Sequence, residues 1–339
     1  MNRVKTTINR FFASKKREAL LIGVIVLLSL AFALVNNAFL NPSNLAAILS
    51  NNAVYGIMAI GMMFVISTGN IDVSVGAQLA AISMLTAKLV SDGAVTNVFA
   101  LMLISLASGL VLGLMNGALV AYLKIPAIIV TLGTLNIMRG VMLLTLGSSW
   151  ISGLPGWFTN AARFKPFGAE LKITAYYWIL ACLLACFVLY KTVMGRRILA
   201  VGTNPEGARR IGFEPKISYV WAFAAMGLSS GLAAFLYTAN VGIAQAVAGN
   251  GYEMTLIAAV VIGGTSFNGG KVSVLGTFLG VLLLGVIESG LVTAKVPVYW
   301  QEFVTGLVII AAIVSAAVKT PSVRKACSKL VRGLGNEKN

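Results

Sequence analysis

Histidine is absent from this sequence of 339 residues, and charged residues make up only 11% of it. The missing histidine removes the commonest general base and the commonest metal ligand. A soluble domain carries roughly 25% charged residues, so this chain has too little polar surface for one. With 58% hydrophobic residues, the composition indicates an integral membrane protein. We expect neither an enzyme active site nor a metal site.

A Walker A motif is also missing. The stretch "GGTSFNGGK" at 263–271 comes nearest to one, but Thr265 stands at its first glycine position and Val272 at its hydroxyl position. Both features are needed, because the glycine lets the backbone cradle phosphates and the hydroxyl binds Mg²⁺. We therefore expect this chain to bind no ATP, Mg²⁺ or other cofactor itself.

Long apolar runs dominate what is present. Most of them approach the ~20 residues that a helix needs to cross a bilayer. The third and eighth runs are short and carry polar or glycine residues near their ends, so we expect them to be broken or only partly spanning. The sequence thus predicts an all-α polytopic membrane protein with about ten transmembrane helices, at 19–38, 45–66, 73–90, 98–122, 126–146, 174–192, 217–238, 252–267, 273–294 and 300–318.

The basic residues set the predicted orientation. With ten spans, 20 of the 26 lysines and arginines fall on the side of the two termini, and five fall on the other side. The positive-inside rule then puts both termini in the cytoplasm. Because these charges lie at the ends of apolar segments, without interleaved aromatics, the net charge of +16 does not indicate nucleic acid binding.

The predicted organisation follows from this orientation. It comprises a cytoplasmic N-terminal segment (1–18), a transmembrane domain (19–318) and a basic cytoplasmic tail (319–339). Segments two to five and seven to ten flank the sixth and enter from opposite sides, so they form an inverted repeat if they are related. Gly109, Gly113 and Gly117 recur every four residues, which favours close helix packing.

Two loops stand out, one on each side. The external loop 147–173 holds Trp150 and Trp157, which fit either an aromatic belt at the membrane interface or a lip that touches an extracytoplasmic partner. The cytoplasmic loop 193–216 is long and basic.

The cytoplasmic loop contains helix start and stop signals. Asn204 precedes Pro205, and Gly212 follows two arginines, which predicts a short helix over 205–211. We expect Glu206 to pair with Arg210 at i,i+4.

A lipid-headgroup anchor would require only the basic residues. The caps, the stop and a smooth Gly207–Ala208 patch favour instead a helix that docks a protein. The candidate docking residues are Asn204, Pro205, Glu206, Gly207, Ala208, Arg209, Arg210, Ile211 and Gly212.

Polar residues at membrane depth are few and mostly neutral. Asp72 fits either a cap on the following helix or a place in the substrate path, and Arg139 fits either a gate or a structural intramembrane pair. A neutral, hydrogen-bonding path suits polyhydroxylated solutes better than ions. The candidate path residues are Asn70, Asp72, Ser74, Asn116, Asn136, Arg139 and Asn268.

Four motifs resemble one family. "GRRILAVGTNPEGARRIGF" at 195–213 is similar to the cytoplasmic coupling loop of the ribose/xylose/arabinose-type permeases of bacterial ABC importers. "GNIDVSVGA" at 69–77 and "KIPAIIVTLGTLNIMRGVMLL" at 124–144 resemble two further signatures of these permeases. So does "AAVVIGGTSFNGGKVSVLGTFLGVLLLGVIESGL" at 258–291, although Val272 or Ser273 replaces a usual glycine.

The resemblance implies a non-catalytic translocation subunit in the inner membrane of a bacterium. It would pair with an identical or related permease, and the predicted helix at 205–211 would dock a cytoplasmic ATPase that binds ATP and Mg²⁺. A periplasmic or lipid-anchored sugar-binding protein would deliver a monosaccharide. The chain also resembles the branch that imports autoinducer-2.

Two alternatives use the same residues differently. An ion-coupled secondary carrier for a small neutral solute would predict paired intramembrane carboxylates and no docking helix. A membrane scaffold would leave the asparagine-rich spans unexplained. The sequence favours the permease over both.

Overall fold

The computed structural model describes residues 2–146, 150–168 and 170–317. The predicted tail at 319–339 and part of the predicted external loop therefore lie outside the described residues. The regular elements of the described chain are helices, and one isolated antiparallel bridge joins Ile151 to Ala244. The elements are α1 (Asn2–Val35), η1 (Asn37–Leu40), α2 (Pro42–Asn51), α3 (Ala53–Ser67), α4 (Val75–Ser91), α5 (Val98–Leu123), α6 (Ala127–Leu146), α7 (Gly156–Arg163), η2 (Pro166–Gly168), α8 (Ile173–Lys191), α9 (Val193–Thr203), α10 (Pro205–Arg210), α11 (Pro215–Val241), α12 (Tyr252–Ile262), α13 (Val274–Thr293) and α14 (Val298–Ala317).

The ten predicted apolar segments all correspond to helices, and the all-α polytopic fold is confirmed. Six helices of the described chain are long and apolar enough to cross a membrane, and α2 with α3 forms a seventh span that bends by 44°. The remaining three, α4, α12 and α14, are shorter apolar helices. Ten apolar segments are thus present, but several of them are interrupted or short.

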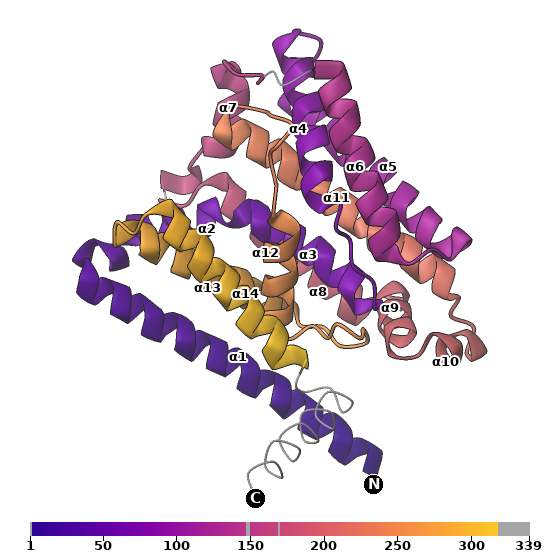
Figure 1. The fold of residues 1–339 in the computed structure, drawn as a ribbon. Coiled ribbons are helices and arrows are strands. Elements are labelled where there is room, and N and C mark those ends of the chain that lie inside the picture. The colour runs from indigo at the N-terminus through magenta and orange to yellow at the C-terminus, as the bar shows by residue number, and fades with distance from the viewer. Residues whose placement is uncertain (1, 147–149, 169, 318–339) are drawn as a thin grey trace, which may run out of the picture.

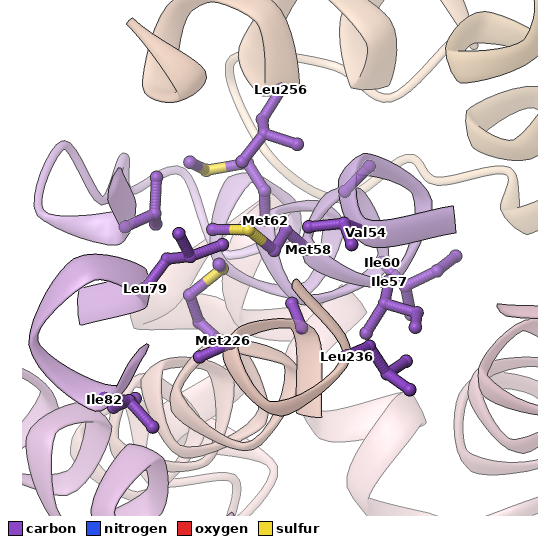
Figure 2. Close-up of a cluster of buried hydrophobic side chains, with 14 of the residues drawn as sticks. Val54, Ile57, Met58, Ile60, Met62, Leu79, Ile82, Met226, Leu236 and Leu256 are labelled. Atoms are coloured by element: carbon purple, nitrogen blue, oxygen red, sulfur yellow. The ribbon is translucent and has the colours of Figure 1, made fainter. Parts of the chain in front are cut away.

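Helix α3 lies at the centre of the molecule. Each of its residues except Tyr55 is buried, so this helix has no face left for lipid. Figure 2 shows Met58 and Met62 of α3 among Leu79 of α4, Met226 of α11 and Leu256 of α12. Because a helix that is apolar on all sides is stable only inside a protein or a membrane, α3 forms the core around which the other spans pack. By contrast, α1 lies along the outside against α13 (Figure 1).

Helices α5 and α11 make the most extensive contact between any two elements. Their contact depends on glycine, as the spacing predicted. A Cβ atom at Gly109 would collide with the carbonyl oxygen of Gly227, and one at Gly113 would collide with that of Phe223. In a membrane, where lipid is as apolar as leucine, such close approach of two backbones supplies the packing that holds helices together.

Two non-helical segments, here called the extended segments, interrupt the spans from opposite ends of the molecule. Residues 68–74 lead into α4 from the end where α9 and α10 lie, here called the α10 end. Residues 242–251 lead into α12 from the opposite end, where α7 lies, here called the α7 end (Figure 1). At 11 residues, α12 spans only about 16 Å of a hydrocarbon core that is about 30 Å thick. The extended chain therefore covers the rest of the depth, which confirms that the third and eighth segments are only partly helical spans.

The first turn of α4, just after the first extended segment, meets the second extended segment at Gly76 and Gly249. A Cβ atom at Gly76 would collide with the carbonyl oxygen of Gly249, whose own φ of 68° is readily adopted only by glycine. The first turn of α4 thus lies directly on the chain that leads into α12. Each group of spans predicted to form an inverted repeat contributes one of these segments.

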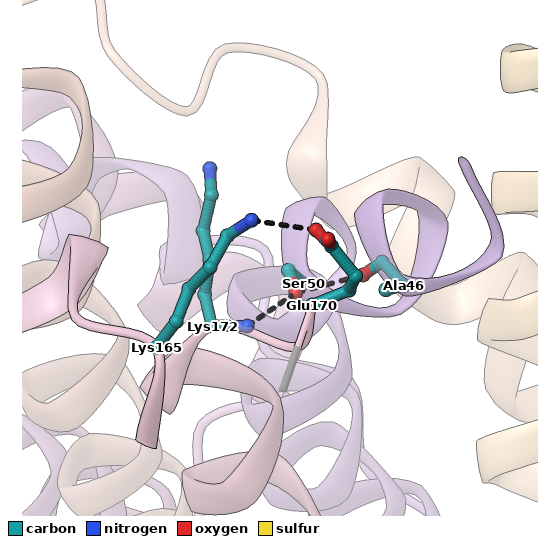
Figure 3. Close-up of polar contacts among 5 residues, drawn as sticks. All are labelled: Ala46, Ser50, Lys165, Glu170 and Lys172. Carbon is teal, nitrogen blue, oxygen red and sulfur yellow. Dashed lines mark hydrogen bonds and ion pairs between the residues drawn. The ribbon is translucent and has the colours of Figure 1, made fainter. Parts of the chain in front are cut away.

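The residues before α8 pack onto the end of α2 at the α7 end. The backbone N–H of Lys172 donates to Ser50 Oγ at 3.1 Å, and Ser50 Oγ donates to the Ala46 carbonyl at 2.7 Å (Figure 3). In the same loop Lys165 pairs with Glu170 at 2.7 Å. Burial lowers the pKa of Lys172, and the positive charges of Arg163 and Lys165 lower it further.

We predict that Gly109→Ala lowers the thermal unfolding midpoint of the purified protein. The added methyl group has no room against α11, and overpacking of this kind costs about 1–3 kcal/mol. Gly23→Ala in α1 is the matched control, because nothing lies within 4 Å of a Cβ atom built there. Equal midpoints for the two variants, measured by intrinsic fluorescence in detergent, would contradict the role given to this contact.

Candidate translocation and coupling sites

The predicted docking helix is present as α10. Its N-cap is Asn204, whose side-chain oxygen accepts the N–H of Gly207 at 3.0 Å, and Pro205 occupies its first turn. The chain leaves the helix through Gly212, at a φ of 83°. The sequence signals therefore identified both ends of this helix, which is shorter by one residue than predicted.

Two details of α10 differ from the prediction. Ala208 is only 3% exposed, so Gly207 and Ala208 do not form an open patch, whereas Ile211 is 67% exposed at the end of the helix. The pair expected between Glu206 and Arg210 is not among the ion pairs of the described residues, and Arg209 pairs with Glu214 at 3.5 Å. The surface that α10 offers is thus an exposed isoleucine among exposed charged side chains.

A second helix, α9, precedes α10 and was not predicted as a helix. Thr192 caps it by accepting the N–H of Gly195 at 3.3 Å. At its other end, Gly202 lies against the carbonyl oxygen of Ser67, the last residue of α3, and against the N–H of Gly270. Gly270 also donates to the same Ser67 oxygen at 2.9 Å. The end of α9, the end of α3 and the 263–273 loop therefore touch backbone to backbone.

Asp72, Ser74 and Asn116 come together in a buried network inside the bundle. Asp72 is 0% exposed and accepts hydrogen bonds from the Ser74 N–H at 2.9 Å and the Ser74 hydroxyl at 2.6 Å. Gln78, which the sequence reading missed, donates to Asp72 at 3.1 Å, and Asn116 donates to Ser74 Oγ at 2.9 Å. The network fixes the start of α4 rather than lining an open space.

Helix α6 braces both extended segments. Thr131 Oγ1 accepts the N–H of Val73 at 3.1 Å. Two turns along, Arg139 donates to the carbonyl oxygens of Ala246 and Ala248, the latter at 2.9 Å, and to Asn250 Oδ1 at 3.1 Å. Arg139 has no carboxylate within ion-pair distance among the described residues, so its partners are the backbone carbonyls that a non-helical segment leaves free.

The other predicted path residues lie apart from this network. Asn70 donates to Thr68 Oγ1 at 2.9 Å, and the backbone of Asn268 lies beside Gly69 at the α10 end. Asn136 is exposed on α6, where its side chain donates to the Leu132 carbonyl at 2.9 Å. The structure thus does not gather the predicted path residues into one site.

Polar space lies elsewhere, in a cavity of about 510 Å³ between α3, α12, α13 and α14. A second cavity of about 300 Å³ shares Asn52, Tyr55 and Glu288 with it. The sequence offered one signal for this site, the polar residues Gln301, Glu302 and Thr305 in the first two turns of an otherwise apolar span. The full polar lining is Asn52, Tyr55, Asn250, Tyr252, Thr255, Glu288, Gln301, Glu302 and Thr305.

The chain is a polytopic helical bundle with two interrupted spans, polar cavities and a capped surface helix. This architecture is typical of membrane transport proteins. Comparison with known proteins gives the family. Residues 44–313 match the family described as "Branched-chain amino acid transport system / permease component", and the chain belongs to this family. It is a transmembrane permease, and the family-level resemblance found in the sequence is confirmed.

Curated relatives agree with this assignment. The chain is 36% identical over 303 residues to the autoinducer 2 import system permease protein LsrC of Salmonella choleraesuis, an alignment that covers 89% of this chain and 86% of that protein. It is also 36% identical over 307 residues to the protein of the same name in Escherichia coli O9:H4, covering 89% and 87%. No solved structure matches the chain significantly.

We predict that Arg139→Ala lowers the thermal unfolding midpoint in detergent more than Arg196→Ala, a change at an exposed arginine of α9. Loss of Arg139 frees the carbonyls of Ala246 and Ala248, and the charge-assisted bonds it makes are worth roughly 1.5–3 kcal/mol each. An unchanged midpoint together with an altered substrate preference would instead place Arg139 in the path.

Proposed function

We propose that this chain is the translocating subunit of a bacterial ABC importer for a monosaccharide or a related polyhydroxylated solute. In this proposal the chain binds no nucleotide, and a partner ATPase binds ATP and Mg²⁺ and docks at α10. The observation that carries the proposal is α10 itself, a capped six-residue helix with an exposed apolar end. The "import system" of the named relatives supports the direction of transport.

The contacts of α9 explain how docking would act on the spans. A displacement of α10 moves α9, and Gly202 of α9 abuts Ser67 and Gly270 with no side chain between them. Because Ser67 ends α3 and residues 68–74 follow directly, the displacement reaches the first interrupted segment. Packed backbones have few alternative arrangements, so such contacts transmit a shift rather than absorb it.

The orientation follows from the charges. The α10 end carries Arg196, Arg209 and Lys271, and the positive-inside rule assigns this end to the cytoplasm of a bacterial inner membrane. Both termini would lie on that side. The α7 end would face the periplasm, where the 147–173 loop and its cations Arg163, Lys165 and Lys172 would meet a sugar-binding protein.

A second permease subunit, identical or related, would cover α6. Asn136 is exposed on a face where Gly133 and Gly140 leave open space. An amide facing lipid is costly, whereas small and amide side chains are typical of contacts between membrane helices.

The experiment changes the exposed end of α10. We expect Ile211→Asp to abolish uptake of radiolabelled sugar and co-purification of the ATPase, because a carboxylate replaces the apolar side chain that would enter the ATPase. Membrane insertion and thermal stability should stay at the wild-type level. Val193→Asp is the control, since Val193 is also an exposed apolar residue of the 193–216 loop. Full uptake by the Ile211→Asp protein would overturn the docking assignment.

A further inference from the structure

We infer that the cavity between α3, α12, α13 and α14 is a solute site lined by residues of this chain, and that it takes a neutral, compact, polyhydroxylated molecule. The inference deepens the proposed function and rests on it. Its volume of about 510 Å³ lies inside the range of roughly 300–1,000 Å³ that is usual for small-molecule sites.

Two interruptions of the spans converge on this cavity. Asn52 stands at the break between α2 and α3, where the pair bends by 44°. Residues 250–252 mark the start of α12, after the extended segment. Both breaks line the cavity, and interrupted helices are where transporters commonly bind solute, because the freed backbone and helix ends supply polar groups at depth.

Tyr55 and Tyr252 join these two breaks. Their ring centroids are 4.3 Å apart, and the rings are inclined by 32°. Tyr55 is the one residue of α3 that is not buried. An aromatic pair with hydroxyl tips offers ring surface to the C–H face of a sugar and hydrogen bonds to its rim.

Two carboxyl groups are the acidic groups of the cavity lining. Glu288 of α13 is the only charged residue in that helix, and it makes no ion pair with any described residue. A carboxyl group at membrane depth without a cation is costly, and this cost marks Glu288 as functional. Glu302 adds a second carboxyl group, and neither cavity has a lysine or arginine among its described lining residues.

This lining discriminates between solute classes. A phosphorylated or carboxylate solute would find no cation in this lining, so the lining disfavours anions. Hydroxyl groups donate to carboxyl oxygens, and the Asn52 amide oxygen adds another acceptor, since the amide NH₂ is engaged with the Ile48 carbonyl at 2.9 Å. The apolar residues Leu256, Val281 and Leu284 complete a mixed lining that suits a sugar ring better than an ion.

The second cavity adjoins the first on the side of the α7 end. The second cavity extends from the shared residues to Asn44, near the start of α2, and to Thr293, the last residue of α13. In the proposed orientation this end is periplasmic. A solute released by a binding protein would then approach Glu288 from that side.

The first test uses thiol labelling of the full chain in spheroplasts. In a background with Cys182→Ser, Cys186→Ser and Cys327→Ser, we introduce Thr305→Cys in the cavity and Thr96→Cys on the exposed loop before α5 as the control. A membrane-impermeant methanethiosulfonate should label both from outside. D-ribose, D-xylose or L-arabinose at high millimolar concentration should slow labelling only at position 305.

Each contrary outcome of the labelling is decisive. No external labelling at position 305, with normal labelling at position 96, would overturn the cavity as a periplasmic site. Labelling that none of the three sugars slows would overturn the solute class. Protection by the cation choline, but by none of the sugars, would also overturn it.

The second test separates this inference from the proposed function. In the importer assembled with its ATPase and binding protein, Glu288→Gln should reduce the maximal rate of sugar uptake about tenfold, the effect of losing one charge-assisted hydrogen bond. The half-saturating concentration should change little, because the binding protein sets it. ATPase co-purification should remain normal, and Thr96→Val in the loop before α5, which removes a hydroxyl outside the cavity, should leave the rate unchanged.

The outcomes of the second test point to different failures. Wild-type uptake with an unaffected Glu288→Gln rate would overturn the cavity site and leave the proposed function standing. ATPase co-purification without uptake of any sugar by the wild-type importer would overturn the monosaccharide assignment in both.

Discussion

The structure depends on the close approach of Gly76 and Gly249, where the first turn of α4 meets the segment that leads into α12. Inside a bilayer no water satisfies a free N–H or C=O group, so non-helical chain survives only where protein supplies partners. Here α6 supplies them, through Thr131 on one segment and Arg139 on the other. Any side chain at Gly76 would push the first turn of α4 away from Gly249. The interruptions that shape the bundle interior therefore depend on a contact that only glycine permits.

The functional parts lie in order from the α10 end toward the α7 end. At one end α10 presents Ile211. Helix α9 connects α10 to Ser67, which the backbone of Gly202 contacts directly. In the middle the Asp72 network holds the start of α4 rigidly. Toward the other end the polar cavity is walled by α12, whose first turn follows the second segment. A movement of the interrupted segments would thus change the cavity without unfolding any long helix.

The sequence predicted the elements well, because apolar runs, caps and glycine spacing are local signals. The limits of α10 follow from Asn204 and Gly212, and the α5–α11 contact follows from Gly109 and Gly113. Its predictions about the path were weaker, since whether a polar residue faces a cavity depends on neighbours distant in sequence. Asp72 sits in a buried network with Ser74, Gln78 and Asn116, and the cavity combines residues from four helices. Helix α9 was missed because Gly195 and Gly202 read as loop residues, whereas in the fold they provide contact points.

The central claim is that movement at α10 reaches both extended segments. Hydrogen exchange of the assembled importer, followed by mass spectrometry with and without a non-hydrolysable ATP analogue, tests it most directly. The account predicts that peptides covering 68–74 and 242–251 change their exchange together with α9 and α10. A change confined to α9 and α10, with both extended segments unaltered, would contradict it.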